Sequence, residues 1–241
     1  MVYKVVFDVR TPIITNTPIH FDALLSAVHP AMHNGYGLTR RSGAESVVTA
    51  PLPIDSVKIN DTWMWCCSTA DYADAKPYTD KITKRKDGVD YFYIDGRQTP
   101  RTGPGRDRCD TVYGVSCSAV SFLASTADVK ELNRICQRVN NIGGLRKMGY
   151  GEVTQYRIEE TNLRWEDCVI CGGVAIRNIP AEMLENNCLN RVCTKDPYWL
   201  PANLHYGVQS GEKAKLKPEV WLNAYRSRQI RARIEIREHV V

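Results

Sequence analysis

A short glycine-rich stretch combines the backbone freedom and the positive charge that contact with a phosphate chain requires. Four glycines and two adjacent cations lie within residues 143–151: Gly143, Gly144, Arg146, Lys147, Gly149 and Gly151. Glycine lets a chain turn sharply and lets another backbone approach closely, while cations and exposed amides bind phosphate oxygens. The stretch therefore predicts contact with an RNA backbone; the alternative is a helix C-cap followed by an ordinary turn. Tyr150 either stacks on a base or packs in the core.

Two further groups of arginines extend the predicted RNA contact. Arg40 and Arg41 follow the first predicted helix, at a position that can lie near the glycine-rich stretch. Arg101, Arg106 and Arg108 belong to a segment rich in proline and glycine, which is typical of a loop that reaches outward. Runs of charge are most often solvated surface, and that is the alternative for both groups.

The histidines are the candidate catalytic residues for RNA cleavage, because a metal-independent ribonuclease needs a general acid or base. His29 and His33 lie four residues apart near the end of the first predicted helix. An endoribonuclease that uses this pair is the alternative function. Histidines near a helix end are more often ordinary polar residues of that end than catalytic groups. The preferred interpretation therefore assigns no catalytic residue.

The cysteines offer a possible metal site. Cys168 and Cys171 are spaced as in many zinc sites, and Cys188 with Cys193 could complete a four-thiolate set. The second spacing is loose, and Cys171 lies in an apolar segment where cysteine behaves as a small hydrophobe. The sequence therefore predicts no cofactor, with zinc as the weaker alternative.

The composition limits the classes of protein. The chain has 241 residues, a net charge of +5 and nine cysteines. A positive charge permits a nucleic-acid partner, and no apolar run approaches the ~20 residues that cross a bilayer. An odd number of cysteines without a secretory signal indicates reduced thiols. We expect a cytoplasmic protein with no membrane contact.

The elements that must position the glycine-rich stretch can be read from hydrophobic periodicity. Residues 2–10 alternate as a half-buried strand, and Thr17-Pro18 predicts the start of a helix that runs to about Val28. Residues 109–123 suit a central strand. An apolar stripe from Val129 to Val139 predicts a second helix, which Ser125 or Thr126 would cap and Gly143 would end. Residues 152–158 form the next strand.

This order predicts an α+β fold with a ferredoxin-like, RRM-like domain in residues 1–160. An insertion built around a hairpin occupies about residues 40–108, and the glycine-rich loop occupies 143–151. Residues 161–241 predict a mostly β extension or a second small domain, in which residues 230–237 alternate most clearly. A sheet of this kind is a common platform for single-stranded RNA.

Several of these features together resemble the RAMP superfamily, the RRM-like RNA-binding proteins of CRISPR–Cas complexes. The likeness rests on the N-terminal strand, the helix start Pro18 to Leu25, the loop Gly144 to Gly151 and the turn Pro197-Tyr198-Trp199. Within that superfamily the sequence is most similar to the Cas5-class subunit of type IV effector complexes. The resemblance covers residues 1–160 by the order of elements, and the remainder more loosely.

The resemblance implies a role in antiviral defence as part of a ribonucleoprotein complex. Such subunits bind the 5′ handle of a crRNA and cap a filament of backbone subunits. They also contact the large subunit near the place where target DNA enters. They usually do not cut RNA where a separate processing nuclease exists. Processing nucleases of the superfamily carry the glycine loop close to the C-terminus, whereas about 90 residues follow it here.

Overall fold

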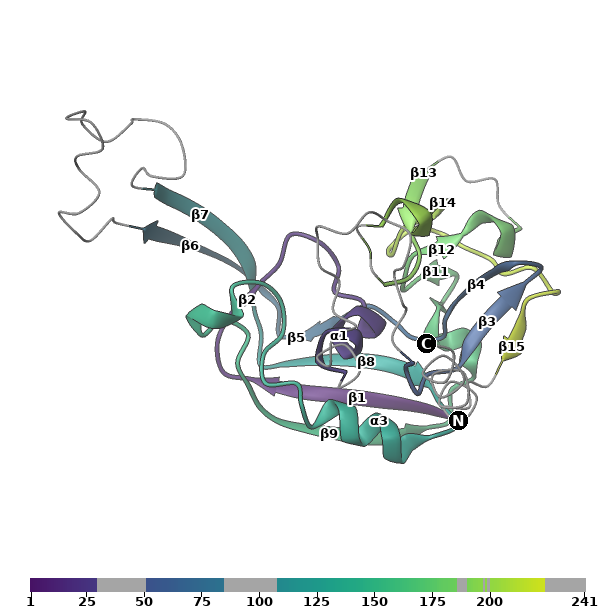
Figure 1. Cartoon of the computed structure of the whole chain (residues 1–241), viewed down its shortest axis with the longest axis horizontal. Helices are drawn as coiled ribbons and strands as arrows, with labels where there is room; N and C mark the ends of the chain where they lie inside the picture. Colours follow the sequence, from purple (N-terminus) through teal and green to yellow (C-terminus); the bar gives the residue numbers. More distant parts are fainter. Residues whose placement is uncertain (30–50, 85–107, 186–189, 197, 199, 224–241) are drawn as a thin grey trace, which may run out of the picture.

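The main sheet of the protein has four antiparallel strands. The computed structural model describes residues 1–29, 51–84, 108–185, 190–196, 198 and 200–223. The sheet order is β5–β8–β1–β9, with β5 Asp71–Ala73, β8 Ala119–Ser125, β1 Val2–Val9 and β9 Val153–Thr161. The central strand β1 pairs with β8 along one edge and with β9 along the other. Figure 1 shows these strands as the base of the molecule.

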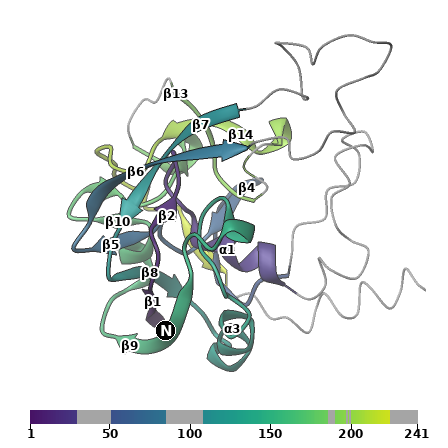
Figure 2. The same ribbon diagram turned by 90° about the vertical axis from the view of Figure 1, so that its left-hand side faces the viewer.

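Two helices cover one face of this sheet. Val5, Phe7 and Val9 on β1 share a buried cluster with residues of α1 (Phe21–Val28) and α3 (Val129–Cys136). Phe21 stacks on Phe122 of β8 with ring centroids 4.7 Å apart. Figure 2 shows both helices on the same side of the sheet. The predicted strands at both ends of this unit and the two helices are confirmed.

The helix boundaries differ from the expectation. Helix α1 begins at Phe21, after His20 in an extended conformation, and the hydroxyl of Thr15 donates to the carbonyl of Thr17 in the segment before it. Asp128, and not Ser125 or Thr126, caps α3 by accepting from the amide of Glu131 at 2.9 Å. Helix α3 ends at Cys136 rather than at Gly143. Residues 137–142 are irregular, yet they keep Val139 and Ile142 buried, which explains why the apolar stripe looked longer.

A long two-stranded arm leaves the main sheet. The predicted strand 109–123 is in fact two strands, β7 (Arg108–Ser116) and β8, separated at residues 117–118. Strand β6 (Lys76–Lys84) pairs with β7 along its whole length, and β2 (Ile13–Ile14) pairs with the base of β7. In Figure 1 the arm projects away from the rest of the protein. Residues 85–107 of the predicted insertion lie outside the described residues.

The remaining strands build a second core beside the main sheet. Strands β12 (Ile179–Pro180), β14 (Leu204–Val208) and β13 (Asn190–Cys193) form one sheet, and β15 (Trp221–Asn223), β3 (Ser56–Ile59) and β4 (Thr62–Trp65) form another. A short hairpin joins β10 (Ile170–Cys171) to β11 (Val174–Ala175). Single 3₁₀ turns are η2 (Arg146–Met148), η3 (Trp165–Cys168), η4 (Ala181–Met183) and η5 (Pro201–Asn203). The C-terminal part is therefore mostly β up to residue 223; residues 230–237 lie outside the described ranges.

The fold is α+β, as predicted. No helix within the described ranges combines the length and the apolar character that crossing a membrane demands.

Candidate nucleic-acid interface at the glycine loop

The glycine loop is held at both ends by backbone hydrogen bonds to the segment that leads into β2. The amide of Gly144 donates to the carbonyl of Ile14 at 2.7 Å, and the amide of Gly151 donates to the carbonyl of Pro12 at 2.8 Å. The amide of Ile142 donates to the carbonyl of Gly151 at 2.8 Å and closes the loop. The residues between these anchors are presented to solvent on a fixed base.

The glycines divide into those that packing requires and one that faces open space. Gly143 and Gly151 have φ of +89° and +63°. A Cβ on Gly143 would come within 2.7 Å of the carbonyl oxygen of Ile14, and a Cβ on Gly151 would overlap the carbonyl oxygen of Ile142. Gly149 has φ of +85° with no atom within 4 Å of its Cβ position. The loop is therefore partly the structural turn of the alternative interpretation, with Gly149 left at its exposed tip.

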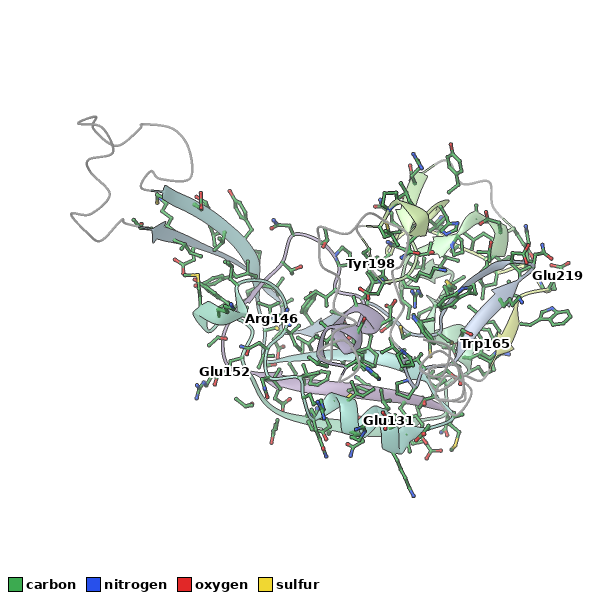
Figure 3. All side chains as sticks on the ribbon, in the orientation of Figure 1. Glu131, Arg146, Glu152, Trp165, Tyr198 and Glu219 are labelled. Atoms are coloured by element: carbon green, nitrogen blue, oxygen red, sulfur yellow. The ribbon has the colours of Figure 1, made fainter. Side chains whose placement is uncertain are left out.

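Arg146 and Lys147 lie side by side on the exposed 3₁₀ turn η2, and Figure 3 labels Arg146 there. Neither cation forms an ion pair with another described residue. The hydrogen bonds of the turn run from the amides of Met148 and Gly149, so the amides of Arg146 and Lys147 have no partner within it. Two unpaired cations and two free amides can hold an anion.

A shallow pocket of about 400 Å³ lies beside this turn, between the ends of the two helices. Arg146 and Arg138 supply two cations to its lining, and Asn140 and Asn141 supply two amide side chains. Ala27 and Val28 at the end of α1 complete it. Because none of its described lining residues is a carboxylate, this glycine-loop pocket suits a phosphate group.

Tyr150 connects the glycine loop to the arm. Its hydroxyl donates to the carboxylate of Asp80 on β6 at 2.5 Å, and its ring lies 6.4 Å from that of Tyr78. The hydrogen bond to Asp80 raises the pKa of Tyr150 to about 12, and the same bond lowers the pKa of Asp80. The ring is half-buried, so Tyr150 is neither a core plug nor a free stacking surface. It fixes the base of the arm against the loop.

The other predicted RNA contacts are only partly within the described structure. Arg108 begins β7, opposite Lys84 at the outer end of the described arm. Four of the predicted residues lie outside the described ranges: Arg40, Arg41, Arg101 and Arg106.

The alternative catalytic pair and the alternative zinc ligands are also only partly described. His29 follows the last residue of α1, and burial lowers its pKa, while His33 lies outside the described residues. Cys168 is buried, Cys171 is exposed on β10, and Cys193 lies on β13 in another sheet. Cys188 lies outside the described residues. Within the described part of the chain, no three histidine, cysteine or acidic side chains gather as a metal site would need.

A second polar cluster, buried beneath the C-terminal sheet, had no signal in the sequence. Arg177 and Asp22 are completely buried, with nitrogen and oxygen 3.8 Å apart. Arg177 also donates to the carbonyls of Thr194 and Trp65. The hydroxyl of Tyr198 donates to Asp22 at 3.0 Å. This cluster holds Tyr198, from the predicted aromatic turn, against the start of α1.

Sequence reasoning also missed part of the glycine-loop pocket. Arg138, Asn140 and Asn141 lie between the end of α3 and the loop, where the expected helix would have turned Asn140 away from Arg138 and Asn141. The available signal was three polar residues immediately before a glycine-rich turn. This signal is weak, because the three side chains come together only when the glycine loop folds back onto Ile14.

The α+β fold and the exposed basic loop agree with the RAMP class of CRISPR–Cas proteins that the sequence resembles. The chain belongs to the family of the CRISPR type IV associated protein Csf3, whose sequence model matches residues 2–209. The predicted membership of a type IV RAMP-class subunit is confirmed, and the match extends through β14, beyond the N-terminal region. No curated protein matches the chain.

Proposed function

We propose that this protein is the guide-RNA-binding subunit of a type IV CRISPR effector complex, holding the 5′ handle of the crRNA at the glycine loop. The observation that carries the proposal is the exposed, unpaired pair Arg146 and Lys147 beside a pocket that adds Arg138 and two asparagine amides. Backbone phosphates are the groups that such a set of cations and amides recognises.

The main sheet supports this function as a ferredoxin-like, RRM-like unit. With the intervening strands β2, β3, β4, β6 and β7 set aside, the elements β1, α1, β5, β8, α3 and β9 have the order strand, helix, strand, strand, helix, strand. Their spatial order, β5–β8–β1–β9, places the first and third of these strands in the centre. On this interpretation the arm is inserted between the second and third strands, residues 1–160 form the RAMP domain, and residues 161–241 form its extension.

The arm points to the partners of the subunit. The Tyr150–Asp80 hydrogen bond sets the arm at a fixed angle to the loop that holds the RNA. An arm that projects from the body can reach a neighbouring protein along the same RNA. We propose the backbone subunits and the large subunit as partners, with target DNA nearby and the complex in the cytoplasm.

Charge reversal at the loop tests the RNA assignment. The double variant Arg146→Glu, Lys147→Glu should bind repeat-derived RNA at least tenfold more weakly and with a shallower dependence on salt, because two phosphate contacts are lost. The control is Lys58→Glu, Lys213→Glu, which makes the same change of charge at exposed lysines away from the loop. If the loop variant binds as tightly as the parent, the assignment fails.

We propose further that the protein binds the RNA without cutting it. Purified protein incubated with repeat RNA and EDTA should leave the RNA intact. Specific cleavage that is lost in His29→Ala or His33→Ala would instead establish the metal-independent endoribonuclease.

A further inference from the structure

A second pocket lies at the other end of α1 from the glycine loop. It has a volume of about 500 Å³ and opens between the turn that precedes α1 and the sheet of β12, β14 and β13. Its lining includes His20, Asn178, Arg191, Cys193, Tyr198 and Gln209. We call it the His20–Tyr198 pocket. Its volume is in the range of pockets that hold small ligands.

The pocket has an aromatic wall. The rings of His20 and Tyr198 are stacked with centroids 4.1 Å apart and an angle of 21° between their planes. Tyr198 cannot turn away because its hydroxyl is bonded to buried Asp22. A rigid aromatic wall at the edge of a pocket favours a planar ring as the ligand.

His20 has hydrogen-bonding capacity that the protein does not use. His20 is buried, with 6% of its surface exposed, and its Nδ1 has no hydrogen-bond partner among the described residues. Burial lowers the pKa of His20 to about 4, so the ring is neutral at neutral pH and offers one donor and one acceptor. Buried polar atoms normally have partners. Because Nδ1 is itself closed to solvent, the His20 ring serves as part of the aromatic wall rather than as an open hydrogen-bonding edge.

The charge around the pocket selects an anionic ligand. Arg191 is an exposed cation in the lining, and none of the described lining residues is a carboxylate. Asp22, behind Tyr198, is paired with Arg177. Tyr206 lies directly opposite Arg191 in the pairing of β13 with β14 and is 58% exposed. Tyr206 is not itself in the lining, but it places a further aromatic ring beside the Arg191 cation, just outside the pocket.

The place of the pocket relates it to the glycine loop. Ala27 and Val28 at the end of α1 line the glycine-loop pocket, whereas Pro18 and His20 at its start line the His20–Tyr198 pocket. A helix of eight residues is about 12 Å long. Figure 3 shows Arg146 on the loop and Tyr198 between α1 and the C-terminal sheet. A short length of single-stranded RNA can span both pockets.

We propose that the His20–Tyr198 pocket receives one base of the bound RNA, splayed from the strand, with Arg191 holding the adjacent phosphate. This inference rests on the proposed RNA-binding function and assigns a second contact point to the same ligand. It makes the C-terminal sheet a part of the RNA-binding surface.

Alkylation of Cys193 tests the occupancy of the pocket. Cys193 is partly exposed in the lining, and Cys171 is exposed on the β10–β11 hairpin outside it. The full-length protein is treated with iodoacetamide, alone or saturated with repeat-derived RNA, and both thiols are followed by mass spectrometry. We expect RNA to lower the labelling of Cys193 relative to Cys171 at least fivefold. An unchanged ratio in the RNA complex overturns the inference.

Two further measurements separate a failure of the proposed function from a failure of the pocket assignment. Mononucleotides at the same nucleotide concentration should protect Cys193 far less than RNA, because only RNA is also held at the glycine loop; equal protection would overturn the assignment to an RNA base. If the parent protein binds no RNA, the proposed function fails. If RNA binds through Arg146 and Lys147 but does not protect Cys193, the pocket assignment alone fails.

Substitution at the rim gives an independent measure. The double variant Arg191→Ala, Tyr206→Ala should bind RNA about tenfold more weakly, because a base contact and a phosphate contact are both lost. Tyr113→Ala is the control, since Tyr113 on the arm is also 58% exposed. Equal affinity of the rim variant and the control would overturn the inference.

Discussion

The hydroxyl of Tyr150 donates a 2.5 Å hydrogen bond to the carboxylate of Asp80, joining the glycine loop to the arm. The two residues come from elements that are far apart in the chain. The loop is anchored to Pro12 and Ile14, and the arm is anchored through β2, so this bond closes a ring of contacts around the base of the arm. This bond and the Tyr78–Tyr150 ring contact add a direct side-chain link between the arm and the loop to the backbone anchors through Pro12, Ile14 and β2.

Removing this contact should loosen the arm without unfolding the protein. Tyr150→Phe keeps the ring and deletes the hydroxyl, so we expect faster hydrogen exchange in β6 and in the glycine loop, with little change in the global unfolding midpoint. Asp80→Asn should have a smaller effect, because the amide oxygen still accepts a hydrogen bond. Exchange measured by mass spectrometry checks this, and unchanged rates in Tyr150→Phe would contradict it.

Acid should have a similar local effect. The pKa of Asp80 is lowered by the hydrogen bond from Tyr150, so the link contributes stability above the carboxyl's ordinary range and loses it as the pH falls through the lowered folded-state pKa. We expect the protection factors of β6 amides, which correct for the intrinsic pH dependence of exchange, to fall below about pH 4 in the parent. In Asp80→Asn the acid-dependent fall should be smaller, and an equal fall in both proteins would contradict this origin.

The glycines of the loop should differ sharply in their tolerance of alanine. Gly151→Ala places a Cβ on the carbonyl oxygen of Ile142 at a positive φ, so we expect a loss of about 3 kcal/mol or more in the free energy of unfolding. Gly149→Ala meets no neighbour and carries only the cost of its positive φ, about 1–2 kcal/mol. Urea denaturation measures both. Equal losses would show that steric contact with Ile142 does not matter.

Periodicity made much of the main sheet predictable from the sequence. The alternation in β1 and the apolar spacings of α1 and α3 arise from burial on one face, which is a local property of the chain. Strand β5 had no such signal, since Asp71 and Ala73 are exposed and join the sheet through backbone pairing with β8. The division of residues 109–123 into two strands was missed for a similar reason, because both halves are rich in strand-forming residues.

The sites were less predictable than the elements because they depend on long-range contacts. The basic glycine loop could be recognised since its residues are adjacent in sequence. The His20–Tyr198 pocket joins the turn before α1 to a C-terminal sheet, and the Asp22–Arg177 pair joins the same two regions. No local pattern indicates which buried charge will meet which partner.

Removing one partner of the Asp22–Arg177 pair should lower the free energy of unfolding more than replacing both residues. Arg177→Met leaves the carboxylate of Asp22 buried without its cation, so we expect a loss of about 3–5 kcal/mol in the free energy of unfolding. Adding Asp22→Asn removes the unpaired charge and keeps an acceptor for the hydroxyl of Tyr198. The double variant should therefore be more stable than Arg177→Met alone. Urea denaturation of the two single variants and the double variant checks this, and strict additivity would contradict a coupled pair.

Asp196 should make the stability of the protein depend on pH between about 4 and 6. Burial raises the pKa of Asp196 to about 6, although the hydroxyl of Ser26 donates to its carboxylate at 2.7 Å and opposes that shift. The folded protein then holds a proton that the unfolded chain releases above about pH 4. This carboxyl therefore contributes stability below pH 4 that is lost as the pH rises to about 6.

Asp196→Asn removes that titration and keeps an acceptor for the hydroxyl of Ser26. Relative to the parent, the variant should gain nothing near pH 4 and up to about 3 kcal/mol in the free energy of unfolding at pH 7. Burial of His20 acts in the opposite direction, since its lowered pKa makes both proteins less stable as the pH falls from about 6.5 to 4. That effect is common to parent and variant, so the difference between them isolates Asp196. Urea denaturation at several pH values gives this difference, and a constant offset at every pH would contradict the assignment.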